Sequence, residues 1–424
     1  MTWRPGIIRI NGCPAKRIHI AWRGFASVLV ALSCTEAVER SPAPDHEYQS
    51  RTVWKAGADV PQLSLRSKTT YCPSGSSRSD CWALDNGTPK DAFVTTNGHV
   101  VFFDHKAGLV EMDSAGHHVA DLGGLGTDPG SYRRVTSLGG SAARTFTMWD
   151  PFLDRLTVIK PGQKPRTAWV KDPRVEAVLA ADTFAVALSV PAAEAPGVRV
   201  LATIASILPN GKLSSSIATV VALATTRKKR EIQAIPSFFW PRPIWSLGQD
   251  GSVTYVPPDT SLRIEVYDSA GHPKLLVTGE LPFPGEPVTQ REIRERQESF
   301  YQTVMHEPML PAGSCNLTVQ STDTLDSNIQ CATARFLDAV GKRSPRLHPP
   351  ITDVVSLAPQ GFWVKTSRIR GDSATWLVAD STGKLVGLVM LKVAERPIGR
   401  HRALIAIADS TDGRTSVSWR EVIQ

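Results

Sequence analysis

The sequence of 424 residues lacks the short motifs that mark the common catalytic folds. It contains no Gly-x-Ser-x-Gly nucleophile elbow, no His-Glu-x-x-His zinc motif, no Walker phosphate loop and no dinucleotide-binding glycine fingerprint. Charged residues are also few, at 21 %, whereas hydrophobic residues make up 42 %, which is enough for a sizeable core. With 31 glycines and 31 prolines, this balance favours short strands joined by tight turns over long amphipathic helices.

No segment is apolar for long enough to form a permanent membrane helix. The apolar stretch over residues 24–34 has eleven residues, fewer than the roughly 20 that a hydrocarbon core needs. It follows a basic segment with five Lys or Arg residues and no acid, so we expect residues 1–33 to be a secretory signal peptide. Without them the net charge falls from +8 to +3, and the basic balance no longer indicates a nucleic-acid partner.

The end of this signal resembles that of bacterial lipoproteins. Ala31-Leu32-Ser33-Cys34 is similar to a lipobox, in which the cysteine is lipidated and becomes the new amino terminus. The alternative is an ordinary signal peptide cleaved nearby, with Cys34 incidental. We expect residues 34–60, which begin polar and rich in proline, to be a flexible tether, and residues 61–424 to form the folded domain. The protein is then extracytoplasmic, either a membrane-anchored lipoprotein or a periplasmic or secreted protein.

Four of the six cysteines remain if Cys13 leaves with the signal and Cys34 carries the lipid. An even count in an oxidising compartment predicts two disulfides, Cys72 with Cys81 and Cys315 with Cys331. A zinc site is the competing interpretation, but neither pair forms a Cys-x-x-Cys motif or has a histidine at ligand spacing.

A turn motif recurs along the chain. Asp113-Ser114-Ala115-Gly116-His117 is repeated unchanged at residues 268–272, and variants occur at 338–342 and 380–384, with looser copies at 160–164 and 208–212. Each copy has the chemistry of a hairpin turn, with Asp or Pro at the start and a Gly that can take positive φ. Alternating apolar and polar residues on both sides indicate strands.

The spacing of these turns predicts the architecture. The turn glycines are 46, 49, 60, 70 and 42 residues apart, and units of about 40–50 residues with four strands are typical of propeller blades. We therefore predict an all-β fold, a six-bladed β-propeller of four-stranded antiparallel blades, with seven blades as the alternative. Strands from both ends of the chain would close the ring, because an open propeller leaves two exposed sheet edges.

The longer spacings require insertions. Residues 288–306 are predicted to contain a helix, because Thr289 and Glu292 form a capping box and an apolar stripe follows. Residues 222–235, with the basic run 227–230, are the second candidate insertion; we expect a solvated loop there rather than a phosphate or lipid contact.

Several segments resemble a known family, the bacterial six-bladed β-propeller proteins of the secreted or lipoprotein type, which are NHL- or TolB-like. The segments are 123–134, Trp149-Asp150 with 155–158, Pro287-Val288-Thr289 and 361–364. The resemblance covers roughly residues 85–424, with Asp128 and Ser131 in place of the family's usual Gly and Glu. It implies the fold and the compartment, not a reaction.

Candidate site residues follow from the propeller prediction, because the first strand of each blade lines the central tunnel. Arg134, Glu176 and Asp353 enter such strands and are our candidate ligand-binding residues for an anionic or hydroxyl-bearing ligand. The alternative is that they pair with one another and solvate the channel. His99, His105, His117 and His118 are interpreted as surface or turn residues, and the turn aspartates as structural.

Two functional classes remain. The first is a non-catalytic binding or interaction propeller whose partner is an unknown protein or a small anionic ligand. Such a protein would contact the membrane through its lipid anchor, and we expect no nucleic-acid partner. The alternative is a hydrolase or lactonase-like enzyme with a central calcium held by oxygen ligands. Only Glu176 and Asp353 qualify as such ligands, so the binding class is favoured. We therefore assign no catalytic residue, no metal ligand and no cofactor. Calcium is expected only if the enzyme alternative holds.

Overall fold

The protein is described from a computed structural model. The described residues are 47–71, 84–85, 92–95, 97–104, 108–113, 117–133, 135–140, 145–160, 162–172, 174–180, 185–191, 199–223, 243–248, 250–259, 261–306, 346–357, 360–401, 404–409 and 414–423. All of them belong to the second of two compact units, residues 41–424; the first comprises residues 1–40. Cys13, Cys34 and the four cysteines of the expected disulfides lie outside the described residues.

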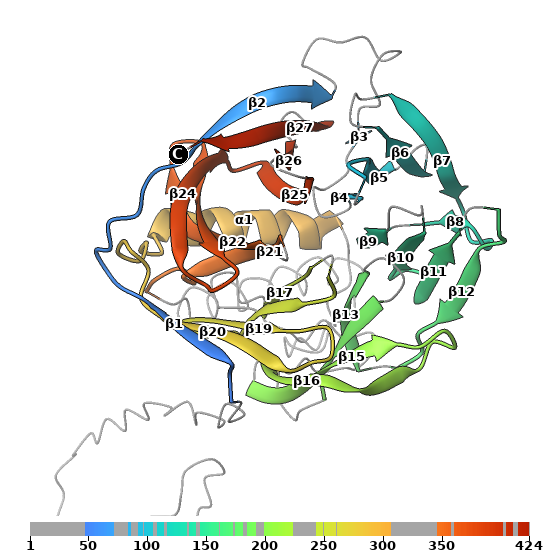
Figure 1. The fold of residues 1–424 in the computed structure, drawn as a ribbon, viewed down its shortest axis with the longest axis horizontal. Helices are drawn as coiled ribbons and strands as arrows, with labels where there is room; N and C mark the ends of the chain where they lie inside the picture. Colours follow the sequence, from blue (N-terminus) through green and yellow to red (C-terminus); the bar gives the residue numbers. More distant parts are fainter. Residues whose placement is uncertain are drawn as a thin grey trace, which may run out of the picture. The chain divides into compact units, whose positions relative to one another are not determined.

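The second unit is a six-bladed β-propeller (Figure 1). Its six sheets have four or five strands, and four successive strands of the chain form each blade except the last. This confirms the predicted fold class and the count of six blades. Residues 338–342, which hold one of the six predicted turns, lie outside the described residues.

The strands of the first three blades are as follows. Blade 1 contains β4 (Ala92–Val94), β5 (Val100–Asp104), β6 (Gly108–Met112) and β7 (His118–Leu125), with β8 (Ser131–Tyr132) beside β7. Blade 2 contains β9 (Ser137–Gly140), β10 (Phe146–Asp150), β11 (Arg155–Ile159) and β12 (Arg166–Trp169). Blade 3 contains β13 (Val175–Ala180), β14 (Ala185–Ser189), β15 (Arg199–Ile207) and β16 (Leu213–Leu223).

The other three blades use both ends of the described chain. Blade 4 contains β17 (Ile244–Leu247), β18 (Val253–Val256), β19 (Leu262–Tyr267) and β20 (Pro273–Gly279), with β1 (Ser50–Trp54) outside β20. Blade 5 contains β21 (Ile351–Ser356), β22 (Gly361–Arg370), β23 (Ser373–Asp380) and β24 (Leu385–Lys392). Blade 6 contains β25 (Glu395–His401), β26 (Leu404–Asp409), β27 (Arg414–Ile423) and β2 (Ser64–Tyr71), and β3 (Leu84–Asp85) also pairs with β27.

Blade 6 closes the ring. Its inner three strands come from the carboxyl end of the chain, and β2 from the amino end pairs antiparallel with β27, from Ser64 opposite Ile423 to Tyr71 opposite Val417. The predicted closure by strands from both ends is confirmed. It covers the edge of β27, which would otherwise present unpaired backbone groups.

The segment before β2 is not wholly a tether. Residues 50–54, inside the predicted tether of residues 34–60, form β1 and pair parallel with β20. The Trp54 indole Nε1–H donates to the Gly383 carbonyl at 2.7 Å, and the Leu63 amide donates to the Leu388 carbonyl on the edge of blade 5 at 2.8 Å. Residues 49–71 thus contact the outer edges of blades 4, 5 and 6 in turn. The sequence prediction missed β1, a short strand on an outer edge with mostly exposed residues.

The recurring turns have the predicted conformation where they are described. Gly162, Gly211, Gly271 and Gly383 have φ between 69° and 87°. The Asp268 carboxylate accepts hydrogen bonds from the amides of Ala270 and His272, at 2.9 and 2.8 Å. A Cβ on Gly271 would lie 2.0 Å from the Ile217 carbonyl oxygen of blade 3, so both φ and close backbone approach require glycine there.

The strand directions define two faces of the propeller. Turns between the first and second, and the third and fourth, strands of a blade lie on one face, which we call the turn face. The connections between blades lie on the other, which we call the connection face. The largest described connection, between β20 and β21, contains α1 (Gln290–His306).

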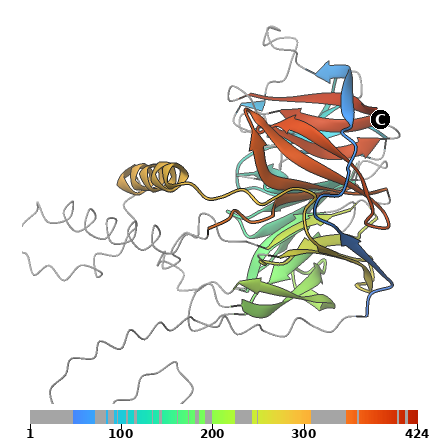
Figure 2. The ribbon, with the colours of Figure 1, turned by 90° about the vertical axis from the view of Figure 1, so that its left-hand side faces the viewer.

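This helix confirms the predicted helical insertion. Thr289 and Glu292 form the capping box, with the Thr289 amide donating to Glu292 Oε2 at 2.8 Å and the Glu292 amide donating to Thr289 Oγ1 at 3.2 Å. Residues 286–288 and 346–348 pair as an antiparallel stalk, and Figure 2 shows α1 standing off the blades at the end of it.

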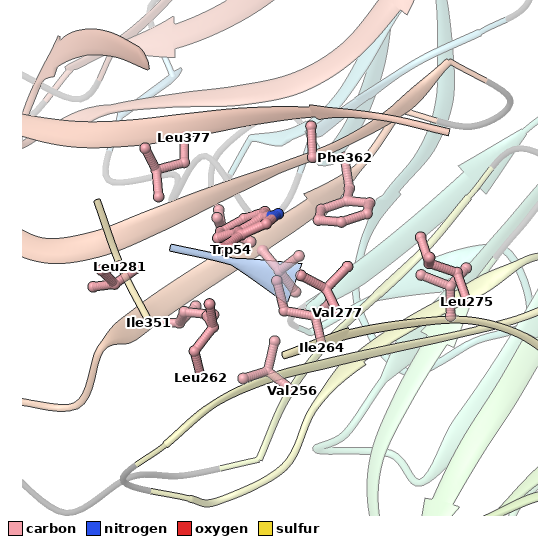
Figure 3. Packing of buried hydrophobic residues seen from close by; sticks show 14 residues of the cluster. Trp54, Val256, Leu262, Ile264, Leu275, Val277, Leu281, Ile351, Phe362 and Leu377 are labelled. Carbon is pink, nitrogen blue, oxygen red and sulfur yellow. The ribbon is translucent and has the colours of Figure 1, made fainter. Parts of the chain in front are cut away.

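The core lies between neighbouring blades. Figure 3 shows the cluster between blades 4 and 5, where Ile264 and Val277 meet Phe362 and Leu377. Trp54 of β1 joins this cluster. Apolar side chains buried between the faces of neighbouring blades therefore hold the innermost strands in position around the tunnel.

Candidate functional site

The six innermost strands are β4, β9, β13, β17, β21 and β25 (Figure 1). Each contacts the innermost strands of both neighbouring blades. They all begin at the connection face, because each follows a connection from the preceding blade. Side chains near their first residues therefore gather at the connection-face end of the tunnel, and this end is our candidate site.

Asp353 lies near the start of β21 and forms an ion pair with Arg396, near the start of β25. Arg396 Nε donates to Asp353 Oδ2 at 2.6 Å and Arg396 Nη2 to Oδ1 at 3.4 Å. The two side chains are only 20 % (Arg396) and 14 % (Asp353) exposed. The shielding from water strengthens the attraction, so the pair ties blade 5 to blade 6 beside the axis.

Two serines make similar links between other blades. Ser137 Oγ on β9 accepts a hydrogen bond from the Ala180 amide on β13 at 2.8 Å. Ser246 Oγ on β17 accepts one from the Ser356 amide on β21 at 2.9 Å. These contacts satisfy backbone groups on strands whose inner edge has no further strand to pair with.

Of the predicted site residues, Asp353 alone is described with its side chain. Glu176 lies on β13 at a β-bulge between Val175 and Ala177, but its side chain is outside the described part, as is the whole of Arg134. Whether these residues meet at the axis stays a prediction. Asp353 itself pairs with Arg396, which the sequence reasoning had not selected.

Arg396 was missed because residues 395–401 were not predicted as a strand. Pro397 interrupts the segment, and the register of β25 against β26 shifts between Pro397 and Gly399. A signal was present, since Glu395-Arg396 places two opposite charges directly before Pro397-Ile398-Gly399. Glu395 is buried and accepts hydrogen bonds from Arg420 and from the Lys392 amide.

The histidines near β5 and β6 each contact a different acid. His99 Nδ1 lies 2.7 Å from Glu111 Oε1, His117 Nδ1 lies 3.2 Å from Asp113 Oδ2, and His118 Nε2 lies 2.9 Å from Asp121 Oδ1. His117 occupies the turn position of His272, as predicted. His105 lies outside the described residues, as does the basic run 227–230.

A buried polar group that the sequence reasoning missed lies on β19. Glu265 accepts hydrogen bonds from Arg263 Nε at 2.5 Å and from the Tyr267 hydroxyl at 2.6 Å. Burial, with the adjacent Glu265 carboxylate, raises the pKa of Tyr267 well above its usual value, so its hydroxyl remains a donor. The Tyr48 ring, just before β1, lies 6.5 Å from the Tyr267 ring. This group is structural, at the interface of blades 3 and 4.

The described part of the chain holds no cluster of three His, Cys, Asp or Glu side chains placed to bind a metal ion. Its one helix, α1, is not long and apolar enough to cross a membrane.

Comparison with known proteins gives similarity of fold only. No protein-family model and no curated protein sequence matches the chain. A candidate exported protein from Bacteroides fragilis is 9 % identical with a TM-score of 0.46, over 88 % of this chain and all of that one. Virginiamycin B lyase from Staphylococcus aureus is 11 % identical (TM-score 0.36; 81 % and 98 % covered). Aldose sugar dehydrogenase from Streptomyces coelicolor is 9 % identical (TM-score 0.38; 86 % and 100 % covered). The strand pairing of the chain itself defines its class, a six-bladed β-propeller.

Proposed function

We propose that this chain is a non-catalytic binding propeller, presented outside the cytoplasm and held at a membrane by a lipid on Cys34. The Asp353–Arg396 pair is the observation that supports a binding role. A carboxylate that acts as a general base or a calcium ligand must offer an oxygen to the substrate or ion. Asp353 is instead ion-paired with Arg396, and the guanidinium charge beside it opposes the approach of a calcium ion and lowers the basicity of the carboxylate.

The binding proposal is tested by assays for the competing activity. We expect no turnover of lactones, sulfate esters or phosphate esters, and no change of melting temperature between calcium and a chelator. A measurable rate that falls when Asp353 or Glu176 is replaced by Ala would establish the hydrolase alternative. A calcium-dependent rise in melting temperature that Asp353→Asn abolishes would place calcium at the tunnel.

The anchor is tested separately by cell fractionation. Cys34→Ser should move the protein from the membrane fraction to the soluble fraction, because lipidation is the attachment that we propose. Cys13→Ser is the matched control and should leave the distribution unchanged. Retention of the Cys34→Ser variant at the membrane would remove the lipid from the proposal without affecting the binding role.

A further inference from the structure

The amino-terminal strand enters the propeller from the turn face. We call the turn between the third and fourth strands of a blade its outer turn. β20 runs from the outer turn of blade 4, at 268–272, to the connection face. β1 pairs parallel with β20, so Ser50 lies at the turn-face end and Trp54 at the connection-face end. The Gln49 amide donates to the Pro273 carbonyl at 3.3 Å, and the chain therefore reaches blade 4 beside this outer turn.

The chain between this point and Cys34 is short. Twelve residues, 35–46, separate Cys34 from Glu47. A segment of that length spans at most about 40 Å when extended and averages about 20 Å as a flexible linker. The seven residues of β20 cover about 23 Å between the two faces, and α1 stands off the blades on the connection face (Figure 2). A lipid on Cys34 therefore favours an orientation in which the turn face lies next to the bilayer.

The outer turns of blades 2 to 5 carry an excess of positive charge. We take each outer turn with the first two residues of the fourth strand, which gives the ranges 160–167, 208–214, 268–274 and 380–386. Their described residues include six exposed cations and two acids: Lys160, Lys164, Arg166, Lys212, Lys274 and Lys384 against Asp268 and Asp380. The inner turns of the same blades add one described acid, Asp250. The described turns are thus net positive on both sides of the point where β1 enters.

The acids of the outer turns serve the turns themselves. Asp268 accepts hydrogen bonds from amides of its own turn, and Asp380 Oδ1 accepts them from the amides of Thr382 and Lys384, at 2.8 and 3.1 Å. The outer turn of blade 3 also exposes an aliphatic side chain, because Leu208 is 39 % exposed. Exposed lysines beside an aliphatic side chain suit an anionic lipid surface, where charge attraction and apolar burial act together.

We propose that the turn face of blades 2 to 5 docks on the anionic phospholipid headgroups of the membrane that holds the chain, a proposal that rests on the Cys34 anchor proposed above. Headgroup phosphates complement the lysines, and a flat bilayer can approach the short outer turns, whereas α1 stands in its way on the connection face. Each lysine near an anionic surface adds a small attraction. The turn face therefore orients an anchored chain but does not replace the lipid, and the tunnel entrance faces away from the membrane.

Site-specific photo-cross-linking measures this orientation. The lipidated full chain, in vesicles of phosphatidylethanolamine and phosphatidylglycerol, carries p-benzoylphenylalanine in place of Lys212 on the turn face. The matched control carries it in place of Lys392, an exposed lysine that ends β24 at the connection face. We expect at least fivefold more cross-linked phospholipid from position 212 than from position 392.

Charge reversal tests the docking surface itself. The full chain with Cys34→Ser should float with phosphatidylglycerol vesicles at millimolar lipid, and at least tenfold less with phosphatidylcholine vesicles. Adding Lys164→Glu/Lys212→Glu/Lys384→Glu should lower binding to phosphatidylglycerol at least tenfold. The matched control, Lys171→Glu/Arg370→Glu/Lys392→Glu, makes the same charge change at exposed positions of the connection face and should lower it less than twofold. Melting temperatures verify that each variant is folded.

Three outcomes would overturn the docking proposal. The first is equal cross-linking from the two positions. The second is that the Cys34→Ser chain has no affinity for phosphatidylglycerol vesicles. The third is equal weakening by the two triple variants, which would show an effect of net charge alone. The anchor is judged separately by the fractionation described above, so a failure of docking and a failure of lipidation are distinguishable.

Discussion

At the scale of residues, the buried glutamates that the structure describes contact nearby side chains or accept hydrogen bonds from backbone amides. Glu265 is the clearest case, because its oxygens accept hydrogen bonds from Arg263 and Tyr267 while the side chain is only 5 % exposed. Removing one member of such a group leaves the other buried without compensation, which costs more than the pair itself contributes.

We therefore expect Glu265→Ala to lower the free energy of unfolding by about 3–5 kcal/mol. Glu280→Ala, one residue beyond β20 and exposed, is the matched control and should change it by less than about 0.5 kcal/mol. The measurement is the denaturation midpoint in urea. Equal midpoints for the two variants would show that the Glu265 group contributes no more than a surface acid.

The turn aspartates give a pH dependence of known sign. Burial alone would raise the pKa of Asp268, but hydrogen bonds from the amides and side chain of the turn outweigh it and lower the pKa. The same balance, with Thr382 and Lys384 as donors, lowers the pKa of Asp380. A lowered folded-state pKa stabilises the protein above the unfolded pKa of about 4, and this contribution is lost as the pH falls through the folded pKa.

Asp268→Asn/Asp380→Asn should therefore lose less stability between pH 6 and pH 3 than the wild type loses. The amide keeps an acceptor for the turn amides but does not titrate in this range. Urea midpoints at both pH values measure the difference, and parallel losses would contradict the assignment.

At the scale of elements, the sequence predicts what has a local chemical signature and misses what depends on an irregular strand or a distant partner. The hairpin turns and the capping box of α1 have local chemical signatures, and both are confirmed. β25 was missed because Pro397 and a bulge break its alternation, and β1 because its partner β20 is more than 200 residues away. The site followed the same rule: Asp353 could be placed on an inner strand, but its partner Arg396 depended on the missed strand.

β1 allows a test with adjacent residues on opposite faces. Trp54 is 4 % exposed and packs between blades 4 and 5, whereas Val53 is 63 % exposed. We expect Trp54→Ala to cost about 3–5 kcal/mol and Val53→Ala to have almost no effect on the urea midpoint. If both variants match the wild type, β1 is not a stabilising part of blade 4.

At the scale of the whole molecule, residues 49–71 contact the outer edges of three of the six blades. They pair with β20 of blade 4, with Leu388 of blade 5 and with β27 of blade 6. Each contact covers an outer strand whose unpaired backbone groups would otherwise be open to another chain. Residues 50–54, which the sequence analysis placed in the tether, therefore belong to the outer edge of blade 4.

Truncations from the amino end should show which residues act only as a tether and which stabilise the propeller. A chain starting at Glu47 keeps β1 and β2, so we expect it to be monomeric and to melt with the chain that starts at Cys34. A chain starting at Cys72 loses both strands and exposes the ten-residue strand β27, so it should melt at a lower temperature and associate through that edge. Adding a synthetic peptide of residues 61–71 should partly restore the monomer, because it can pair with β27 in the native register. Light scattering after size exclusion, with thermal melting, distinguishes these states. A monomeric chain from Cys72 with an unchanged melting temperature would show that blades 1 to 6 close without the amino-terminal strands.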